Sequence, residues 1–181
     1  GTSMGGIIGM VLAASHQSPI ERLVINDVGP FIDRDSLLKI GEYIGKSGEF
    51  ATREEAEAYL RDIYAEFGPM DEEDWEHTVK YSTYRTATGR YRMKMDKGVG
   101  DAFRDQISMF DVDMWDVWER ITCPVLILRG ANSSFFSKET AEKMLTCGPE
   151  AELVELGGSG HAPTLRSKEQ VDIISEWLSR A

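Results

Sequence analysis

The arrangement of apolar and polar residues along the chain predicts an α/β fold built on a parallel sheet. Three short apolar runs, rich in branched residues and closed by glycine turns, are typical of buried parallel strands. These runs are 21–27, 124–129 and 151–156. Stretches with helical spacing alternate with them, and these are 4–16, 137–145 and 168–180. The first is apolar all round, so we expect a helix that is buried on most sides.

The middle of the chain has a different pattern of apolar residues. Over residues 33–107 the apolar positions keep helical spacing, and no strong strand pattern is visible. We therefore predict a helical cap inserted into a core formed by residues 1–32 and 108–181. Residues 111–120, where the chain returns to the core, are expected to form one more amphipathic helix.

Composition excludes several classes of protein. The 181 residues are 41% hydrophobic and 28% charged, which is ordinary for a globular domain. A net charge of −11 argues against a nucleic-acid partner, because phosphate binding needs clustered cations. The apolar run 7–14 is too short to cross a bilayer, so we expect no membrane association and a cytoplasmic location. Cys123 and Cys147 lack metal-ligand spacing, so we expect reduced thiols, no metal and no other cofactor.

A serine between glycines near the start of the chain is the candidate nucleophile. Residues 1–5 read Gly-Thr-Ser-Met-Gly and lead directly into the first predicted helix. A nucleophilic serine needs this pattern, because small neighbours permit a sharp strand-to-helix turn and the helix amino terminus favours negative charge. Ser3 would attack the substrate, and the backbone amide of Met4 would donate to the oxyanion. The alternative is a chance match or the remnant of a cleaved tag.

His161 is the candidate general base. It lies in the glycine-rich loop 157–163, between the last predicted strand and the last predicted helix. Such a loop lets an imidazole reach the serine from the carboxyl edge of the sheet. The alternative is a surface histidine without a role. His16 at a helix end and His77 in an acidic helix are interpreted as structural.

Four segments together carry a resemblance to a known family. They are GTSMGG, RLVINDVGP, CPVLILRGANS and GSGHAPTL, and they resemble bacterial α/β-hydrolases of the esterase and lipase-like superfamily. The resemblance extends over nearly the whole chain and is weakest in the predicted cap. It implies a partial α/β-hydrolase fold with Ser3 as nucleophile, His161 as base and a carboxylate that orients the histidine.

The carboxylate is where the chain departs from the family pattern. The resemblance would place an aspartate shortly after the strand at 125–129, where this chain has Ser134. A hydroxyl cannot supply negative charge beside an imidazolium. Asp27, at the end of the preceding predicted strand, is the candidate substitute. The alternative is that Asp27 is a turn residue and that the change at Ser134 leaves a slow enzyme.

These residues predict a serine hydrolase that cleaves an ester or related acyl bond of a small molecule. The alternatives are an impaired or non-catalytic relative that binds a small molecule, and a carbon–carbon bond hydrolase or acyltransferase on the same scaffold. Sequence does not separate these chemistries, because fold does not determine function.

A second departure concerns the start of the sheet. Three strands make a small parallel sheet, and in this fold a loop after an earlier strand supplies the second oxyanion donor. We therefore expect the chain to be a carboxy-terminal portion that is inactive alone. An amino-terminal segment of the same protein, or a second copy, would complete it.

Basic residues in the predicted cap leave one further question open. They interleave with tyrosines over residues 80–97. The simpler interpretation is a solvated strip that pairs with the acidic helix before it. The alternative is that Arg85, Arg90 or Arg92 clamps a substrate carboxylate.

Overall fold

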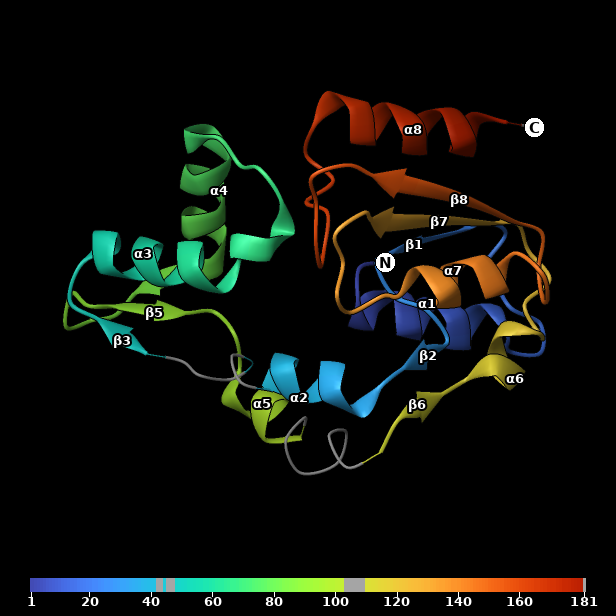
Figure 1. The fold of residues 1–181 in the computed structure, drawn as a ribbon. Helices are drawn as coiled ribbons and strands as arrows, with labels where there is room; N and C mark the ends of the chain where they lie inside the picture. Colours follow the sequence, from blue (N-terminus) through green and yellow to red (C-terminus); the bar gives the residue numbers. More distant parts are fainter. Residues whose placement is uncertain (42–43, 45–47, 103–109, 181) are drawn as a thin grey trace. The chain divides into compact units, whose positions relative to one another are not determined.

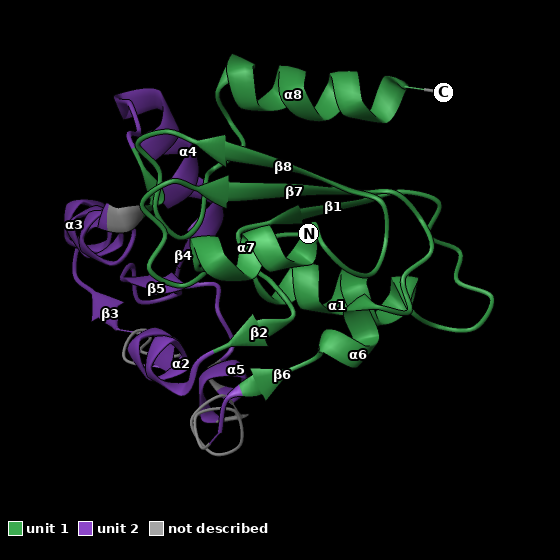
Figure 2. Cartoon of the chain, turned by 45° about the vertical axis from the view of Figure 1, so that its right-hand side comes forward, with its two compact units in different colours: residues 1–32, 66–68, 112–181 green, residues 33–65, 69–111 purple. Residues whose placement is uncertain are grey.

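The computed structural model describes residues 1–41, 44, 48–102 and 110–180 and divides the chain into two compact units (Figure 2). Unit 1 consists of Gly1–Ile32, Glu66–Gly68 and Val112–Ala181, and unit 2 of Asp33–Ala65 and Pro69–Asp111. The predicted boundary at 107 lies outside the described residues. Each unit is described below by itself.

A parallel sheet forms the centre of unit 1 (Figure 1). Its strands are β1 (Leu23–Asn26), β7 (Val125–Gly130) and β8 (Ala151–Leu156), in the order β1-β7-β8. All six residues of the central strand β7 are buried, as expected of a parallel strand covered on both faces. On the other side of β1, Thr2 forms a parallel bridge with Asn26. The predicted α/β fold with a parallel sheet is thus confirmed.

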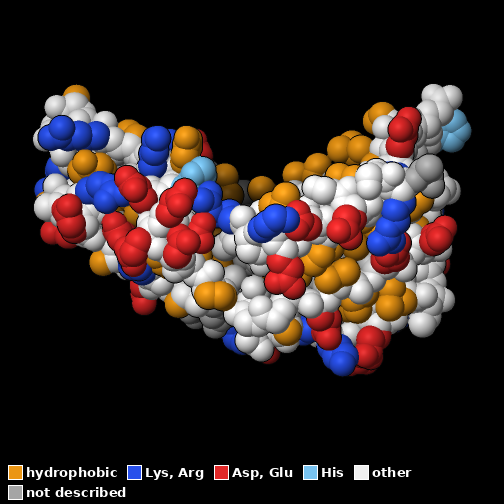
Figure 3. Space-filling model, turned by 90° about the horizontal axis from the view of Figure 1, so that it is seen from above, with side chains coloured by type: hydrophobic (Ala, Val, Ile, Leu, Met, Phe, Trp, Pro, Cys, Tyr) orange, Lys and Arg blue, Asp and Glu red, His pale blue; other side chains and the backbone are white. Residues whose placement is uncertain are grey.

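Helices cover both faces of this sheet. They are α1 (Met4–Ala13), α6 (Trp115–Trp118), α7 (Lys138–Met144) and α8 (Lys168–Ser179). Figures 1 and 2 show α8 on one side of the sheet and α1 with α7 on the other. Trp177 of α8 packs with Leu126 and Leu128 of β7 in a buried cluster. The exposed residues of α8 include the ion pair Lys168–Asp172 and two apolar side chains, Val171 and Leu178. Figure 3 shows basic, acidic and apolar side chains interspersed on the face seen from above.

Two expectations for unit 1 were wrong. Helix α1 is not buried on most sides, because Met4, Ile8, Val11 and Leu12 are about half exposed. The predicted helix over 111–120 is shorter, because its first residues pair as strand β6 (Val112–Asp113) with β2 (Phe31–Ile32). Two-residue strands are too short to produce a recognisable alternation of side chains.

Unit 2 contains helices and also a small sheet. The helices are α2 (Arg34–Gly41), α3 (Arg53–Ile63), α4 (Glu72–Ser82) and α5 (Lys97–Ala102), with the 3₁₀ helix η1 (Ala65–Phe67) at its boundary with unit 1. The strands are β3 (Glu49–Phe50), β4 (Thr83–Arg85) and β5 (Tyr91–Met93), paired antiparallel in the order β3-β5-β4. The expectation that this part of the chain holds no strand was therefore wrong. Its core is formed by Leu60, Trp75, Val79 and Met93.

The small sheet gives two of the basic residues in the segment 80–97 an acidic partner. Arg90 and Arg92 each lie 3.4 Å from a carboxylate oxygen of Glu49 in β3. The expected pairing with the acidic helix before the strip was wrong for these two arginines. Cross-strand pairing brings Arg92 opposite Glu49, which the linear sequence does not reveal.

Candidate active site

Ser3 occupies a strained turn between the edge of the sheet and helix α1. It precedes the first residue of α1 and has φ 49° and ψ −118°, a conformation that non-glycine residues rarely adopt. Its amide donates to the carbonyl of Asn26 in β1 at 3.0 Å. A Cβ on Gly1 would lie 2.3 Å from the carbonyl oxygen of Gly5, and a Cβ on Gly6 would lie 2.5 Å from Val28. The turn therefore requires glycine at both positions. Gly1 belongs to the sequence pattern, whereas a Cβ on Gly5, the second glycine of that pattern, would meet no atom within 4 Å.

His161 links the serine to a buried carboxylate. Its Nε2 lies 3.2 Å from Oγ of Ser3, and its Nδ1 lies 2.8 Å from Oδ2 of Asp27. When Nδ1–H donates to the carboxylate, Nε2 carries the lone pair that faces the serine hydroxyl. The residue is only 8% exposed, so bulk solvent has little access to the imidazole.

Asp27 is fully buried at the carboxyl end of β1. Its backbone has φ 53°, which turns the chain out of the strand, and its amide still donates to Leu128 of β7. Oδ1 accepts the backbone N–H of Gly130 at 2.8 Å, while Oδ2 accepts from Ser133 at 2.6 Å as well as from His161. Three donors thus replace the water that a buried carboxylate loses.

Aromatic rings flank the imidazole. The ring of Phe135 lies with its centroid 4.2 Å from that of His161, in a tilted arrangement. Phe67 approaches edge-on, with its centroid at 6.4 Å. These rings shield the hydrogen bonds of His161 from solvent, which strengthens them.

The structure brings Ser3, His161 and Asp27 together. Met4 opens α1, where backbone N–H groups lack intrahelical acceptors, which is the position required of an oxyanion donor. Ser134 is exposed, whereas its neighbour Ser133 contacts the carboxylate. Sequence reasoning missed Ser133, Phe67 and Phe135, because no motif marks them.

Among the residues that the structure describes, no cluster of three or more His, Cys, Asp or Glu could hold a metal ion. The same residues include no helix with the length and apolar character needed to cross a membrane. Burial raises the pKa of the Cys123 thiol, which disfavours its reactive thiolate form.

Known proteins similar to this chain are hydrolases or share their fold. No family model matches. The 3-hydroxybutyrate-oligomer hydrolase of Cupriavidus necator is 35% identical, over all of this chain and 64% of its own length. An α/β hydrolase of Novosphingobium aromaticivorans is 34% identical with a TM-score of 0.87, over all of this chain and 64% of that one. A Rickettsia typhi protein of known structure is 38% identical with a TM-score of 0.91, over 61% of its length.

The chain thus spans less than two thirds of the length of these relatives. The two relatives of known structure share the fold of this chain over all of its length. Over its whole length the chain has the α/β-hydrolase fold.

Proposed function

We propose that this protein is a serine hydrolase that cleaves an ester or related acyl bond of a small molecule. The observation that carries the proposal is the unbroken hydrogen-bonded series from Ser3 through His161 to the buried Asp27, with distances of 3.2 and 2.8 Å. A nucleophile, a base and a group that orients the base are the three parts that this chemistry requires.

Each residue has a defined part in the reaction. Ser3 Oγ attacks the acyl carbon while His161 Nε2 takes the hydroxyl proton, and the resulting oxyanion is held by the amide of Met4. The protonated His161 then gives its proton to the leaving alcohol as the carbon–oxygen bond breaks, which leaves an acyl group on Ser3. Water, activated by His161, attacks this acyl group and releases the acid. Asp27 keeps Nδ1 protonated and stabilises the imidazolium in both halves of the reaction.

The name of one relative suggests a first substrate. The Cupriavidus protein is named for hydrolysis of 3-hydroxybutyrate oligomers, which are joined by ester bonds. We therefore propose short esters of hydroxy acids as the first compounds to assay. Simple p-nitrophenyl esters of increasing acyl length provide the comparison.

We also infer that activity needs chain beyond the 181 residues. Helix α1 exposes four apolar side chains beside the reactive turn: Met4, Ile8, Val11 and Leu12. Apolar groups on one helix face are typical of a surface that another element covers. In this fold the second oxyanion donor comes from a loop after an earlier strand. An amino-terminal segment of the same protein, or a second copy, would cover α1 and supply that donor.

A fluorophosphonate probe tests the proposal, because it reacts covalently with an activated serine. We expect the full-length protein to be labelled on the peptide that contains Ser3, and the 181-residue chain alone to react much more slowly. Ser3→Ala should abolish labelling, while Ser15→Ala, a change at an exposed serine in the turn after α1, should leave it intact. Equal labelling of Ser3→Ala and the wild type would contradict the proposal, and an unlabelled full-length protein would favour a small-molecule binder.

A further inference from the structure

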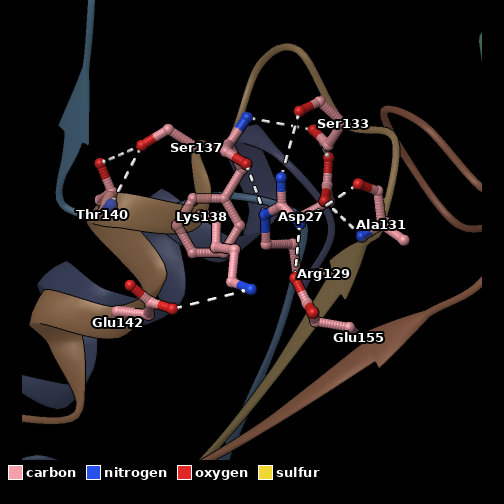
Figure 4. Close-up of polar contacts among 11 residues, drawn as sticks. Asp27, Arg129, Ala131, Ser133, Ser137, Lys138, Thr140, Glu142 and Glu155 are labelled. Atoms are coloured by element: carbon pink, nitrogen blue, oxygen red, sulfur yellow. Dashed lines mark hydrogen bonds and ion pairs between the residues drawn. The ribbon is translucent and has the colours of Figure 1, made fainter.

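A buried hydroxyl contacts the carboxylate of Asp27 on the oxygen that faces the histidine. Oγ of Ser133 lies 2.6 Å from Oδ2 of Asp27, and Oδ2 also accepts from Nδ1 of His161 (Figure 4 shows Ser133 and Asp27). Ser133 is 8% exposed and lies on the loop after β7, whereas Asp27 ends β1. The hydroxyl therefore reaches the acid from a different strand of the sheet.

The direction of this hydrogen bond is fixed by the surrounding backbone. The amide of Phe136 donates to Oγ of Ser133 at 3.1 Å, so this oxygen is already an acceptor and its own proton is free to point at Asp27. The amide of Ser133 donates to the carbonyl of Gly130 at 2.9 Å, which closes the turn. The hydroxyl is thus held as a donor to the carboxylate.

A buried arginine donates hydrogen bonds to several carbonyl groups of the same loop. Arg129 donates to the carbonyl of Phe136 at 2.8 Å and, at 3.4 Å, to the carbonyls of Ala131 and Ser133 (Figure 4). Its charge is balanced by Glu155 of β8 at 2.7 Å. Because the guanidinium has a rigid planar fork, these bonds restrict the loop at several points together.

We propose that Ser133 is a positioning residue that sets the rotation of the Asp27 carboxylate, and through it the orientation and tautomer of His161. The role rests on the proposed serine hydrolase function. Without the hydroxyl, the only described residue that holds Oδ1 is Gly130, and the only described residue that contacts Oδ2 is His161, the imidazole that the carboxylate orients. A group that sets geometry in this way alters the reaction rate and leaves substrate binding unchanged.

The test measures how fast Ser3 of the full-length protein reacts with a fluorophosphonate at increasing probe concentration. We expect Ser133→Ala to lower the maximal rate between about tenfold and about a hundredfold, because hydrogen bonds to charged groups are among the strong ones, with the half-saturating concentration unchanged. Ser133→Cys fills the same space with a weaker donor and should give an intermediate rate, and it serves as the measurement if Ser133→Ala does not fold.

A matched change on the same loop separates positioning from stability. Ser137 accepts from Thr140 at 3.0 Å and caps α7 without contacting Asp27. Ser137→Ala should therefore lower the unfolding midpoint and leave the maximal labelling rate as in the wild type. An equal loss of rate in both variants would show a general loosening of the loop and overturn the positioning role.

A double-mutant cycle provides the decisive comparison. If Ser133 acts through Asp27, then Ser133→Ala introduced into Asp27→Asn should change the rate less than about twofold. Independent effects that multiply in the double variant would overturn the role, as would a Ser133→Ala rate equal to that of the wild type. Wild-type protein whose Ser3 does not react would instead overturn the proposed function, and this role with it.

Discussion

Replacing Asp27 by Asn changes one atom of the site and reverses its hydrogen bonding. The carboxylate accepts three bonds, from Gly130, Ser133 and His161, whereas an amide has one acceptor oxygen and an NH₂ donor. With the amide oxygen on the Gly130 N–H, the NH₂ group faces His161 Nδ1. The imidazole must then turn its lone pair to Nδ1 and place its proton on Nε2, opposite the hydroxyl of Ser3. In that tautomer His161 is no longer a base for the serine.

The structure gives a magnitude for this effect. The opposite orientation of the amide would set its NH₂ against the fixed N–H of Gly130, and such a buried conflict costs about 1–3 kcal/mol. The productive tautomer is therefore reduced by roughly 5-fold to roughly 150-fold. Loss of the charge that stabilises the imidazolium adds to this. The total approaches the fall of about 10⁴-fold found when the same change is made in a well-studied triad.

The assay compares ester hydrolysis and fluorophosphonate labelling of wild type and Asp27→Asn in the full-length protein. The folded fraction is measured by chemical unfolding, so that a loss of activity can be separated from a loss of structure. Asp33→Asn is the matched control, because Asn caps a helix as well as Asp does and should leave both rates unchanged. Turnover by Asp27→Asn within about tenfold of wild type would refute the orienting role, since the tautomer and charge effects together predict about 10⁴-fold.

Three further predictions concern the support of the site and of unit 2. The Nδ2 of Asn26 joins β1 to the base loop through the carbonyl of Pro163 at 2.8 Å, so Asn26→Ala should lower both the labelling rate and, by about 1–3 kcal/mol, the free energy of unfolding, as measured by urea titration. Burial raises the pKa of Asp33, but hydrogen bonds from Ser36 outweigh it and leave the pKa below its ordinary value. The part of its contribution to stability that depends on the charge is therefore present at neutral pH and lost as the pH falls through that lowered pKa, so Asp33→Ala should cost about 1 kcal/mol in urea unfolding at neutral pH and less in acid. Leu60 is fully buried, and Leu60→Ala should lower the unfolding free energy by about 2–5 kcal/mol, whereas a loss below 1 kcal/mol would contradict the packing of the unit 2 core.

The sequence was sufficient for those parts of the fold that depend on local pattern. The run at 125–130 is apolar because the central strand β7 is covered on both faces, and the runs at 23–26 and 151–156 are short segments with branched apolar residues, so each could be recognised alone. The turn at Ser3 could be predicted for a similar reason. The turn leaves no room for a Cβ at Gly1 or Gly6, and these glycines can be recognised in the sequence beside Ser3.

Features that depend on contacts between residues far apart in the sequence could not be predicted. Strand β5 pairs with β3 some forty residues earlier, and its three residues show no alternation that the sequence could display. Phe135 and Ser133 acquire their positions from the course of one loop, and nothing in a phenylalanine or a serine distinguishes them there. The apolar residues of α1 predicted a buried helix, because composition cannot show which part of the protein covers a helix face.

The location of the acid follows from the geometry of two neighbouring strands. Strands β1 and β7 are parallel and adjacent, so their carboxyl ends lie at the same edge of the sheet, within reach of one imidazole. A carboxylate at the end of either strand could therefore orient the base of a hydrolase of this kind. In the proposed reaction Asp27, at the end of β1, supplies the charge, and the loop after β7 donates to it through Gly130 and Ser133. The proposed triad therefore does not need an acid at Ser134, because in it the end of β1 carries the charge and the loop after β7 holds the carboxylate in place.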